Sequence, residues 1–120
     1  MKKRKIIVID DELYILQALK IILDKVGADI YCFSNVEKAL SMLAEETFDL
    51  IISDFNLKQK INGIDLIAKV KNVQPTIKAI IISGSDLSAH NKQLTILDVT
   101  VINKPIDDID IFMGLVKRIF

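Results

Sequence analysis

The chain has 120 residues, of which 51% are hydrophobic and 6% are aromatic, and it contains no tryptophan. This length suits one buried core and is too short for two, so we expect a single domain over residues 1–120. Sixteen basic and sixteen acidic side chains cancel to a net charge of zero, which argues against direct binding to nucleic acid or to an anionic membrane surface.

Short apolar runs alternate with helical periodicity along the chain. In chain order we expect a strand at 5–9, a helix at 12–26, a strand at 29–33, a helix to about 46, a strand at 49–53, a helix at 64–72, a strand at 78–82, a helix at 87–97, a strand at 99–102 and a last helix ending near 120. The pattern at 87–97 is the least regular, because this segment begins with polar residues and contains β-branched side chains.

Local signals support several of these boundaries. Gly27 follows the last apolar position of the first helix and is typical of a helix end. Ser34 and Glu37 have the S-x-x-E spacing of a capping box, which predicts the start of the second helix. Asp107 and Asp108 are expected to cap the last helix.

The last predicted helix has apolar residues on more than one side. One stripe is expected to face the core: Ile109, Phe112, Val116 and Ile119. A second set lies elsewhere on the helix: Ile111, Met113, Leu115 and Phe120. Because surplus apolar surface marks interaction sites, we interpret the second set as a candidate partner face, such as a homodimer contact.

No apolar run approaches the roughly 18 residues that a membrane-spanning helix needs, and none resembles a signal peptide. We therefore expect a cytoplasmic protein. Cys32 is the only cysteine, so an internal disulfide is excluded, and its place in a predicted strand indicates a structural role. His90 is the only histidine, and its polar surroundings predict an exposed residue without a chemical role.

Strands that alternate with helices predict an α/β fold, a doubly wound parallel sheet with helices on both faces. In such sheets, ligands bind beyond the carboxyl ends of the strands, where the strand order reverses. Five polar residues lie at the carboxyl ends of predicted strands: Asp10, Asp11, Asp54, Ser83 and Lys104. We therefore expect a functional site at this edge.

Carboxylates that converge at one edge repel each other, and a bound cation allows them to stay ionised together. Mg²⁺ fits this description, because it takes hard oxygen ligands and is held by one or two carboxylates together with phosphate oxygens. One histidine and one cysteine argue against a zinc site.

A carboxylate beside magnesium is also suited to act as a nucleophile toward phosphorus, and Asp54 is the central candidate. Lys104 and the metal would neutralise the charge on the oxygens of the transferring group. The Ser83 hydroxyl is placed to bind a phosphoryl oxygen after transfer and to turn a local charge change into a loop movement.

Four segments resemble, in their order along the chain, the motifs of receiver domains of two-component response regulators. They are IIVIDDE at 6–12, DLIISD at 49–54, IIISG at 80–84 and NKP at 103–105. The resemblance covers essentially the whole chain. It implies a flavodoxin-like (βα)5 fold with strand order 2-1-3-4-5.

By this resemblance, Asp54 is the phosphoacceptor and takes its phosphoryl group from a histidine of a sensor kinase or of a phosphotransfer protein. Asp11 binds Mg²⁺ directly, Asp10 binds it through water, and the backbone carbonyl of Asn56 is a further ligand. Lys104 pairs with the phosphoryl group. The domain is then not a classical enzyme, since it catalyses only its own phosphorylation and slow dephosphorylation.

The resemblance also implies that Asn56 and Ser85 influence how fast the phosphoaspartate hydrolyses, and that the Lys104–Pro105 bond is cis. Three features depart from the family pattern, one of which is that no Gly-Ala pair precedes the fifth strand. The loop at 55–63 lacks the usual proline and first glycine, and Val101 stands where an aromatic switch residue is common.

Two other functions remain open from the sequence. The departures in the loop and at Val101 would suit a receiver-fold interaction module that does not switch by phosphorylation. Alternatively, Asp54-Phe55-Asn56 has the form of the Asp-x-Asp motif of haloacid-dehalogenase-like phosphatases, but it follows the third strand instead of the first. The chain is also too short for the cap domain that such enzymes usually have.

Overall fold

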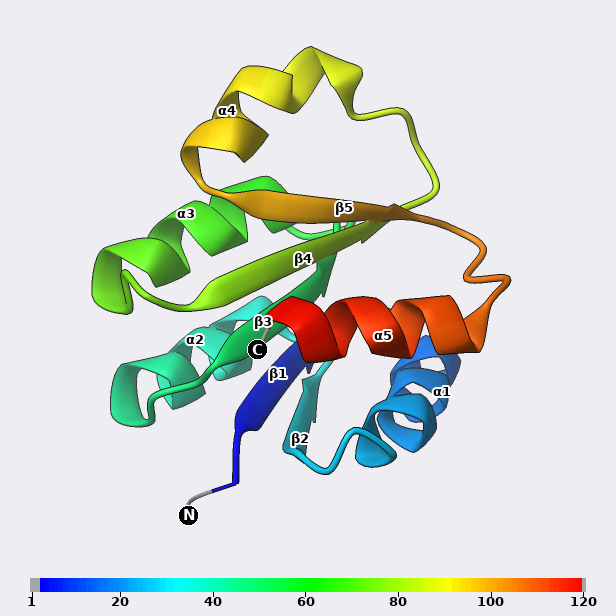
Figure 1. Ribbon diagram of the computed structural model, residues 1–120. Helices are drawn as coiled ribbons and strands as arrows, with labels where there is room; N and C mark the ends of the chain where they lie inside the picture. The colour runs from blue at the N-terminus through cyan, green and yellow to red at the C-terminus, as the bar shows by residue number, and fades with distance from the viewer. Residues whose placement is uncertain (1–2, 120) are drawn as a thin grey trace.

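The computed structural model describes residues 3–119, in which five parallel strands form one sheet (Figure 1). The strands are β1 (Lys5–Ile9), β2 (Asp29–Phe33), β3 (Leu50–Asp54), β4 (Lys78–Ser83) and β5 (Val99–Asn103). Their order across the sheet is β2-β1-β3-β4-β5. The predicted doubly wound α/β fold with strand order 2-1-3-4-5 is therefore confirmed.

Helices connect the strands and cover both faces of the sheet. They are α1 (Leu13–Asp24), α2 (Val36–Glu45), α3 (Gly63–Val73), the short 3₁₀ helix η1 (Ser88–His90), α4 (Asn91–Ile96) and α5 (Ile109–Ile119). Figure 1 shows α1 and α5 side by side on one face and α2 and α3 on the other. Within residues 3–119, no helix has the length and apolar content to cross a membrane.

The strand side chains alternate between two cores. Ile6 and Val8 of β1 pack with α1 and α5, whereas Ile7 and Ile9 pack with α2 and α3. All four side chains are fully buried, and burying each one contributes roughly 1.5–3 kcal/mol. Because both faces of the sheet are covered, the central strands are continuously apolar up to the polar residues that follow them.

The start of α2 differs from the prediction. Asn35 caps this helix, and its side-chain oxygen accepts a hydrogen bond from the Lys38 N–H at 3.0 Å. The capping box expected at Ser34 and Glu37 is wrong, because Ser34 lies one position before the cap and its carbonyl accepts a hydrogen bond from Gln59. A capping box is instead present at the start of α3.

Two other predictions need correction. The segment expected as one helix at 87–97 is divided into η1 and the short α4. In α5, Phe112 and Val116 are buried as expected, but Ile109 is 45% exposed and does not belong to the core stripe. Ile109 is the first residue of α5 and lies before the part of the helix that packs on the sheet. Phe120 lies outside the described residues.

Candidate functional site

The carboxyl ends of β1 and β3 bring three acidic side chains together. Ile9 at the end of β1 lies beside Ser53 in β3, so Asp10 and Asp54 leave the sheet as neighbours. Asp10, Asp11 and Asp54 each present a carboxylate oxygen, and these three oxygens lie within 4.8 Å of one another. The parallel register of the strands therefore builds a compact acidic cluster from segments more than forty residues apart.

Lys104 supplies a positive charge to this cluster from the end of β5. Its Nζ atom lies 3.3 Å from Oδ2 of Asp54 and 3.7 Å from Oδ2 of Asp10. The backbone N–H of Lys104 donates to the carbonyl of Ser83 at 2.8 Å, which extends the pairing of β4 and β5. The predicted cis bond between Lys104 and Pro105 is confirmed.

Burial shapes the charge state of the two inner carboxyl groups. Asp10 is 1% exposed, and burial raises its pKa to about 6. The neighbouring carboxylates of Asp54 and Asp11 also raise this pKa, while the Glu12 N–H, which donates to Asp10 at 3.0 Å, and Lys104 lower it. Burial likewise raises the pKa of Asp54, against the opposing effect of Lys104.

The Ser83 hydroxyl is engaged by its own loop. It donates to the carbonyl of Ser85 at 3.0 Å and accepts from the N–H of Ser85 at 3.0 Å. Ser83 is buried at the end of β4, one residue beyond the position that pairs with Asp54. A ligand oxygen on Asp54 that accepted a hydrogen bond from this hydroxyl would have to replace the bond that Ser83 donates to the Ser85 carbonyl.

Gly63 sets the distance between α3 and the site, a role that its sequence position alone does not reveal. A Cβ atom at this position would collide with the backbone carbonyl oxygen of Asp54 and lie 3.1 Å from Cα of Phe55. The Gly63 N–H donates to the carbonyl of Phe55 at 2.8 Å. The start of α3 therefore packs directly on the backbone of the candidate acceptor.

Lys58 also reaches the site, and sequence reasoning did not single it out. Its Nζ atom lies 3.8 Å from Oδ2 of Asp11. The backbone of Lys58 has φ of +53°, which is uncommon for a residue with a side chain. Its N–H donates to the side-chain oxygen of Asn56 at 3.2 Å. In the sequence, Lys58 is one of several polar residues in the segment at 56–62, and no motif or periodicity distinguishes it.

His90 is not the exposed residue that its polar surroundings predicted. It is half-buried, and its ring centroid lies 5.5 Å from that of Phe55, with the two planes tilted by 48°. Phe55 follows Asp54 directly. The contact therefore links the segment after the candidate acceptor with η1.

The chain resembles known proteins over most of its length. It matches the family described as response regulator receiver domain over residues 6–115. The chain belongs to this family. Receiver domains act in two-component signalling, and this membership agrees with the order and chemistry of the strand-end residues.

Two relatives illustrate the range of proteins to which this receiver domain is similar. It is 31% identical to the response regulator protein PilR of Pseudomonas aeruginosa, over 89% of this chain and 24% of PilR. It is 28% identical to the sporulation initiation phosphotransferase F of Bacillus subtilis, over 98% of this chain and 94% of that protein. The chain spans less than a third of the length of PilR and of three other regulators that it matches.

Solved structures agree with the fold. The chemotaxis protein CheY4 of Vibrio cholerae has a TM-score of 0.87 at 18% identity, covering 99% of this chain and 100% of that one. A CheY-like receiver domain protein of Methanospirillum hungatei has a TM-score of 0.86 at 22% identity, covering 98% and 94% of the two chains. At these identities the likeness concerns the fold.

The donor set of the receiver domain fits magnesium. Among the residues that the structure describes, Asp10, Asp11 and Asp54 form the one group of three or more potential metal-ligating side chains. All three offer hard carboxylate oxygens, and the buried positions of Asp10 and Asp54 make their charges costly without a compensating cation. The cluster therefore suits a small, hard divalent ion.

Val101 lies in β5, half-buried beside α4. It lines a hollow of about 320 Å³ together with residues of α4 and of the turn that follows it. The hollow lies between α4 and β5, so the small side chain of Val101 leaves room where a larger residue would fill the space. Asn56 and Ser85, the other two residues expected to modulate the site, have exposed side chains.

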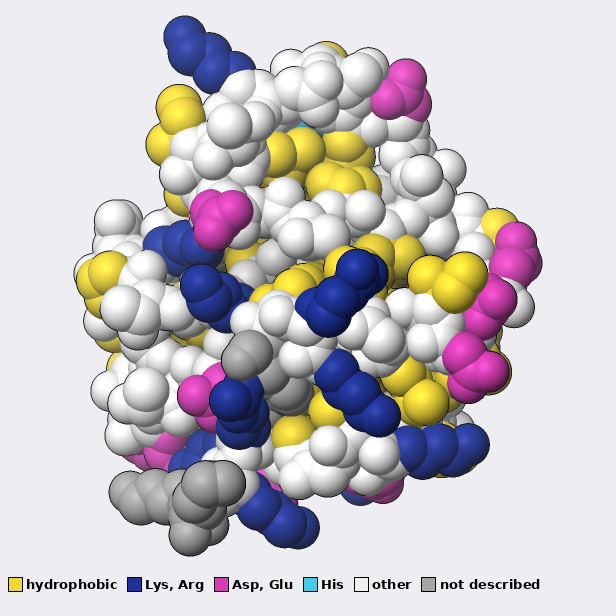
Figure 2. Space-filling view, viewed as in Figure 1, with side chains coloured by type: hydrophobic (Ala, Val, Ile, Leu, Met, Phe, Trp, Pro, Cys, Tyr) yellow, Lys and Arg dark blue, Asp and Glu magenta, His cyan; other side chains and the backbone are white. Residues whose placement is uncertain are grey.

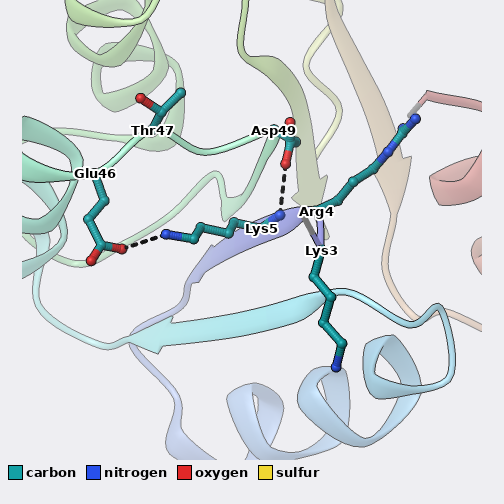
Figure 3. A pocket seen from close by; sticks show the side chains of 6 residues that line it. All are labelled: Lys3, Arg4, Lys5, Glu46, Thr47 and Asp49. Carbon is teal, nitrogen blue, oxygen red and sulfur yellow. Dashed lines mark hydrogen bonds and ion pairs between the residues drawn. The ribbon is translucent and has the colours of Figure 1, made fainter. Parts of the chain in front are cut away.

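A larger hollow of about 600 Å³ lies at the opposite, amino-terminal edge of the sheet (Figure 3). In Figure 3, Lys3, Arg4 and Lys5 extend in different directions, so the basic side chains of this hollow do not converge on one point. Lys5 is already bonded there: its Nζ atom lies 3.1 Å from Glu46, and its backbone N–H donates to Asp49 at 2.8 Å. Size alone therefore does not identify the functional edge.

Proposed function

We propose that residues 1–120 act as a single receiver domain that accepts a phosphoryl group on Asp54 in a magnesium-dependent reaction. The observation that carries this proposal is the convergence of Asp54 with Asp10, Asp11 and Lys104 at one sheet edge. The donor is a phosphohistidine of a sensor kinase or of a phosphotransfer protein, and the exchange takes place in the cytoplasm. With a net charge of zero, the domain itself does not bind nucleic acid.

In the proposed reaction, a carboxylate oxygen of Asp54 forms a bond to phosphorus while the bond from phosphorus to the donor imidazole nitrogen breaks. That nitrogen leaves with the electron pair of the broken bond. Lys104, which already lies 3.3 Å from Asp54, neutralises charge on the transferring oxygens. Asp10, Asp11, Asp54 and the Asn56 carbonyl would hold Mg²⁺, which would supply further charge neutralisation when bound.

The signal leaves the site through Ser83 in this proposal. A phosphoryl oxygen on Asp54 attracts the Ser83 hydroxyl away from Ser85, which releases the loop that leads to η1. Asn56 and Ser85, both exposed, affect how readily water reaches the acyl phosphate. The space beside Val101 gives α4 room to move against β5.

An apolar surface beside the acidic edge supports docking of a donor protein. Leu13 and Tyr14 at the start of α1 are 65% and 67% exposed. A groove of about 510 Å³ lies next to them along α1 and is lined mostly by apolar residues, among them Pro105 and Ile106. Exposed apolar surface of this kind marks protein interaction sites, and here it adjoins Lys104.

The homodimer proposal rests on α5. Ile111 is 67% exposed, and α5 has Asp110 in its first turn and Lys117 and Arg118 in its last turn. Figure 2 shows acidic side chains near the start of α5 and basic side chains near its end. An antiparallel pair of α5 helices would therefore match opposite charges around the apolar residues. Sedimentation over a range of protein concentrations checks this, and a monomer throughout would contradict it.

Phosphoryl uptake tests the proposed function. Incubation with acetyl phosphate and Mg²⁺ should add one phosphoryl group to the wild-type chain, as seen in the intact mass. Chelation of Mg²⁺ or the substitution Asp54→Asn should abolish uptake, because each removes an essential part of the site. Asp49→Asn is the matched control, since it makes the same change at an aspartate that lines the hollow at the opposite edge of the sheet.

The opposite result has a defined meaning. A folded wild-type chain that takes up no phosphoryl group with Mg²⁺ and a competent donor would contradict the proposal. It would leave the receiver-fold interaction module as the remaining function. Uptake that persists unchanged in Asp54→Asn would show that another residue is the acceptor.

A further inference from the structure

The loop between β3 and α3 is fixed at two points on either side of Lys58. Leu57 is 1% exposed and belongs to the core that packs α2 and α3. Gln59 accepts a hydrogen bond from the Val36 N–H at 3.0 Å and donates to the carbonyl of Ser34 at 3.1 Å. Lys58 therefore projects from a segment that is anchored to the body of the domain.

The backbone of Lys58 directs its side chain toward the site. Its φ of +53° lies in the left-handed region, which residues with a Cβ rarely adopt. The hydrogen bond from its N–H to the side chain of Asn56 stabilises this conformation locally. As a result, the Nζ atom of Lys58 lies 3.8 Å from Oδ2 of Asp11.

Lys58 adds a second positive charge beside the three carboxylates. Lys104 pairs with Asp54 and Asp10, at 3.3 and 3.7 Å, and its ion pairs do not include Asp11. Lys58 provides the ion pair of Asp11. Each carboxylate of the cluster therefore has an ammonium group beside it in the structure.

We propose that Lys58 is a positioning residue that compensates the charge of Asp11 in the metal-free domain and thereby limits the affinity of the site for Mg²⁺. The inference rests on the proposed function, because it assigns a determinant of metal affinity to the same site. A divalent ion on Asp11 must either displace the Lys58 ammonium or share the carboxylate with it. In both cases the positive charge of Lys58 opposes binding of the ion.

The loop anchors give this competition a structural consequence. Lys58 lies between Leu57, which is held in the core, and Gln59, which is bonded to the start of α2. If the Lys58 side chain leaves Asp11, any movement of the loop backbone therefore starts between these two fixed residues. Metal occupancy at Asp11 is thus linked to the loop through one side chain. The 67% exposure of the Lys58 side chain leaves room for it to withdraw into solvent.

The test uses three variants of the whole chain. Lys58→Met removes the charge and nearly keeps the length of the side chain. Like lysine, methionine has a Cβ atom, so the cost of the positive φ is unchanged. Lys58→Arg retains the charge. Lys60→Met removes an exposed charge from the same loop, two residues further on, and is the matched control. The dissociation constant for Mg²⁺ is measured at low ionic strength from backbone amide shifts in titrations of metal-free protein.

We expect Lys58→Met to bind Mg²⁺ roughly three- to tenfold more tightly than the wild type, from the lost ion pair and the lost repulsion of a divalent ion. Lys58→Arg and Lys60→Met should stay within about twofold of the wild type, in the range of exposed charges. Higher ionic strength should narrow the difference between Lys58→Met and the wild type, because salt screens the exposed charge.

Two results would overturn the inference, and they are distinguishable. If the wild type binds Mg²⁺ and Lys58→Met binds it equally tightly, or no more tightly than Lys60→Met, Lys58 has no such role while the proposed function stands. If the wild type neither binds Mg²⁺ nor takes up a phosphoryl group, both the inference and the proposed function fail.

Discussion

Asp10 shows how a single residue links the stability of this domain to its chemistry. Its carboxyl group is almost completely buried next to two other carboxylates, and its one hydrogen bond from a backbone N–H and its ion pair with Lys104 compensate only part of the cost. The pKa of Asp10 is therefore raised to about 6. At pH values between the ordinary pKa of 3.8 and the raised value of about 6, the folded chain without metal therefore holds a proton on Asp10 that an unfolded chain would have released.

This raised pKa gives a prediction for metal-free protein. Between the ordinary pKa of 3.8 and the folded value of about 6, the folded state binds more protons than the unfolded state, so stability decreases as the pH rises. The free energy of unfolding should fall by up to about 3 kcal/mol from pH 4 to pH 7. Asp54, whose pKa is also raised, contributes in the same direction.

Urea unfolding in the presence of a chelator, repeated across this pH range, provides the measurement. Asp10→Asn should reduce the pH dependence and be more stable than the wild type at pH 7. Asp107→Asn is the control and should change neither the pH dependence nor the stability, because Asp107 is exposed and the side chain that accepts the capping bond from the Ile111 N–H of α5 is that of Asp108. Stability that increases from pH 4 to pH 7, or an equal slope in Asp10→Asn, would show that Asp10 does not carry the raised pKa.

At the scale of elements, the ends of β1, β3 and β5 could be predicted, whereas the loop after β3 could not. Each strand is mostly apolar, because helices cover both faces of the sheet, and polar residues at or just after its carboxyl end mark where it stops. The loop depends on contacts that are distant in sequence, such as the bonds of Gln59 to Ser34 and Val36. The polar and apolar residues of this loop have no regular period, so the sequence does not predict that Leu57 enters the core or that Lys58 points toward Asp11.

The packing of α3 on the backbone of Asp54 gives a second prediction. Gly63→Ala should lower the free energy of unfolding by about 1–3 kcal/mol, because the new methyl group forces α3 away from the Asp54 carbonyl. It should also weaken Mg²⁺ binding by moving the loop. Gly114→Ala is the matched control, since a Cβ in that position of α5 meets open space, and it should stabilise the chain by about 0.5–1 kcal/mol.

Urea unfolding of the two glycine variants is sufficient for this comparison. If Gly63→Ala were as stable as the wild type, α3 would have to relax without cost, and the close approach to Asp54 would not be a constraint on the site. Loss of stability in both variants would instead indicate a general sensitivity to substitution at glycine.

At the scale of the whole molecule, the carboxyl ends and the amino ends of the parallel strands form two opposite edges with different roles. Parallel strands place all of their carboxyl ends at one edge, which is why the sequence alone predicts that Asp10, Asp54 and Lys104 meet. The distances among them, the bonds of Ser83 to Ser85 and the contact of His90 with Phe55 required the structure, since each depends on how loops fold back. The amino-terminal edge has the larger hollow, but its charged groups are already paired or divergent.

The most direct test of the central claim is to locate, by backbone amide NMR, where a phosphoryl analogue binds. Beryllofluoride added with Mg²⁺ should shift the resonances of Asp11, Asn56, Ser83 and Lys104 at the carboxyl edge and leave Lys5 and Asp49 at the opposite edge unchanged. Asp54→Asn should abolish the response. The claim would be contradicted if the wild type showed no shifts at the carboxyl edge, or if Asp54→Asn showed the same shifts.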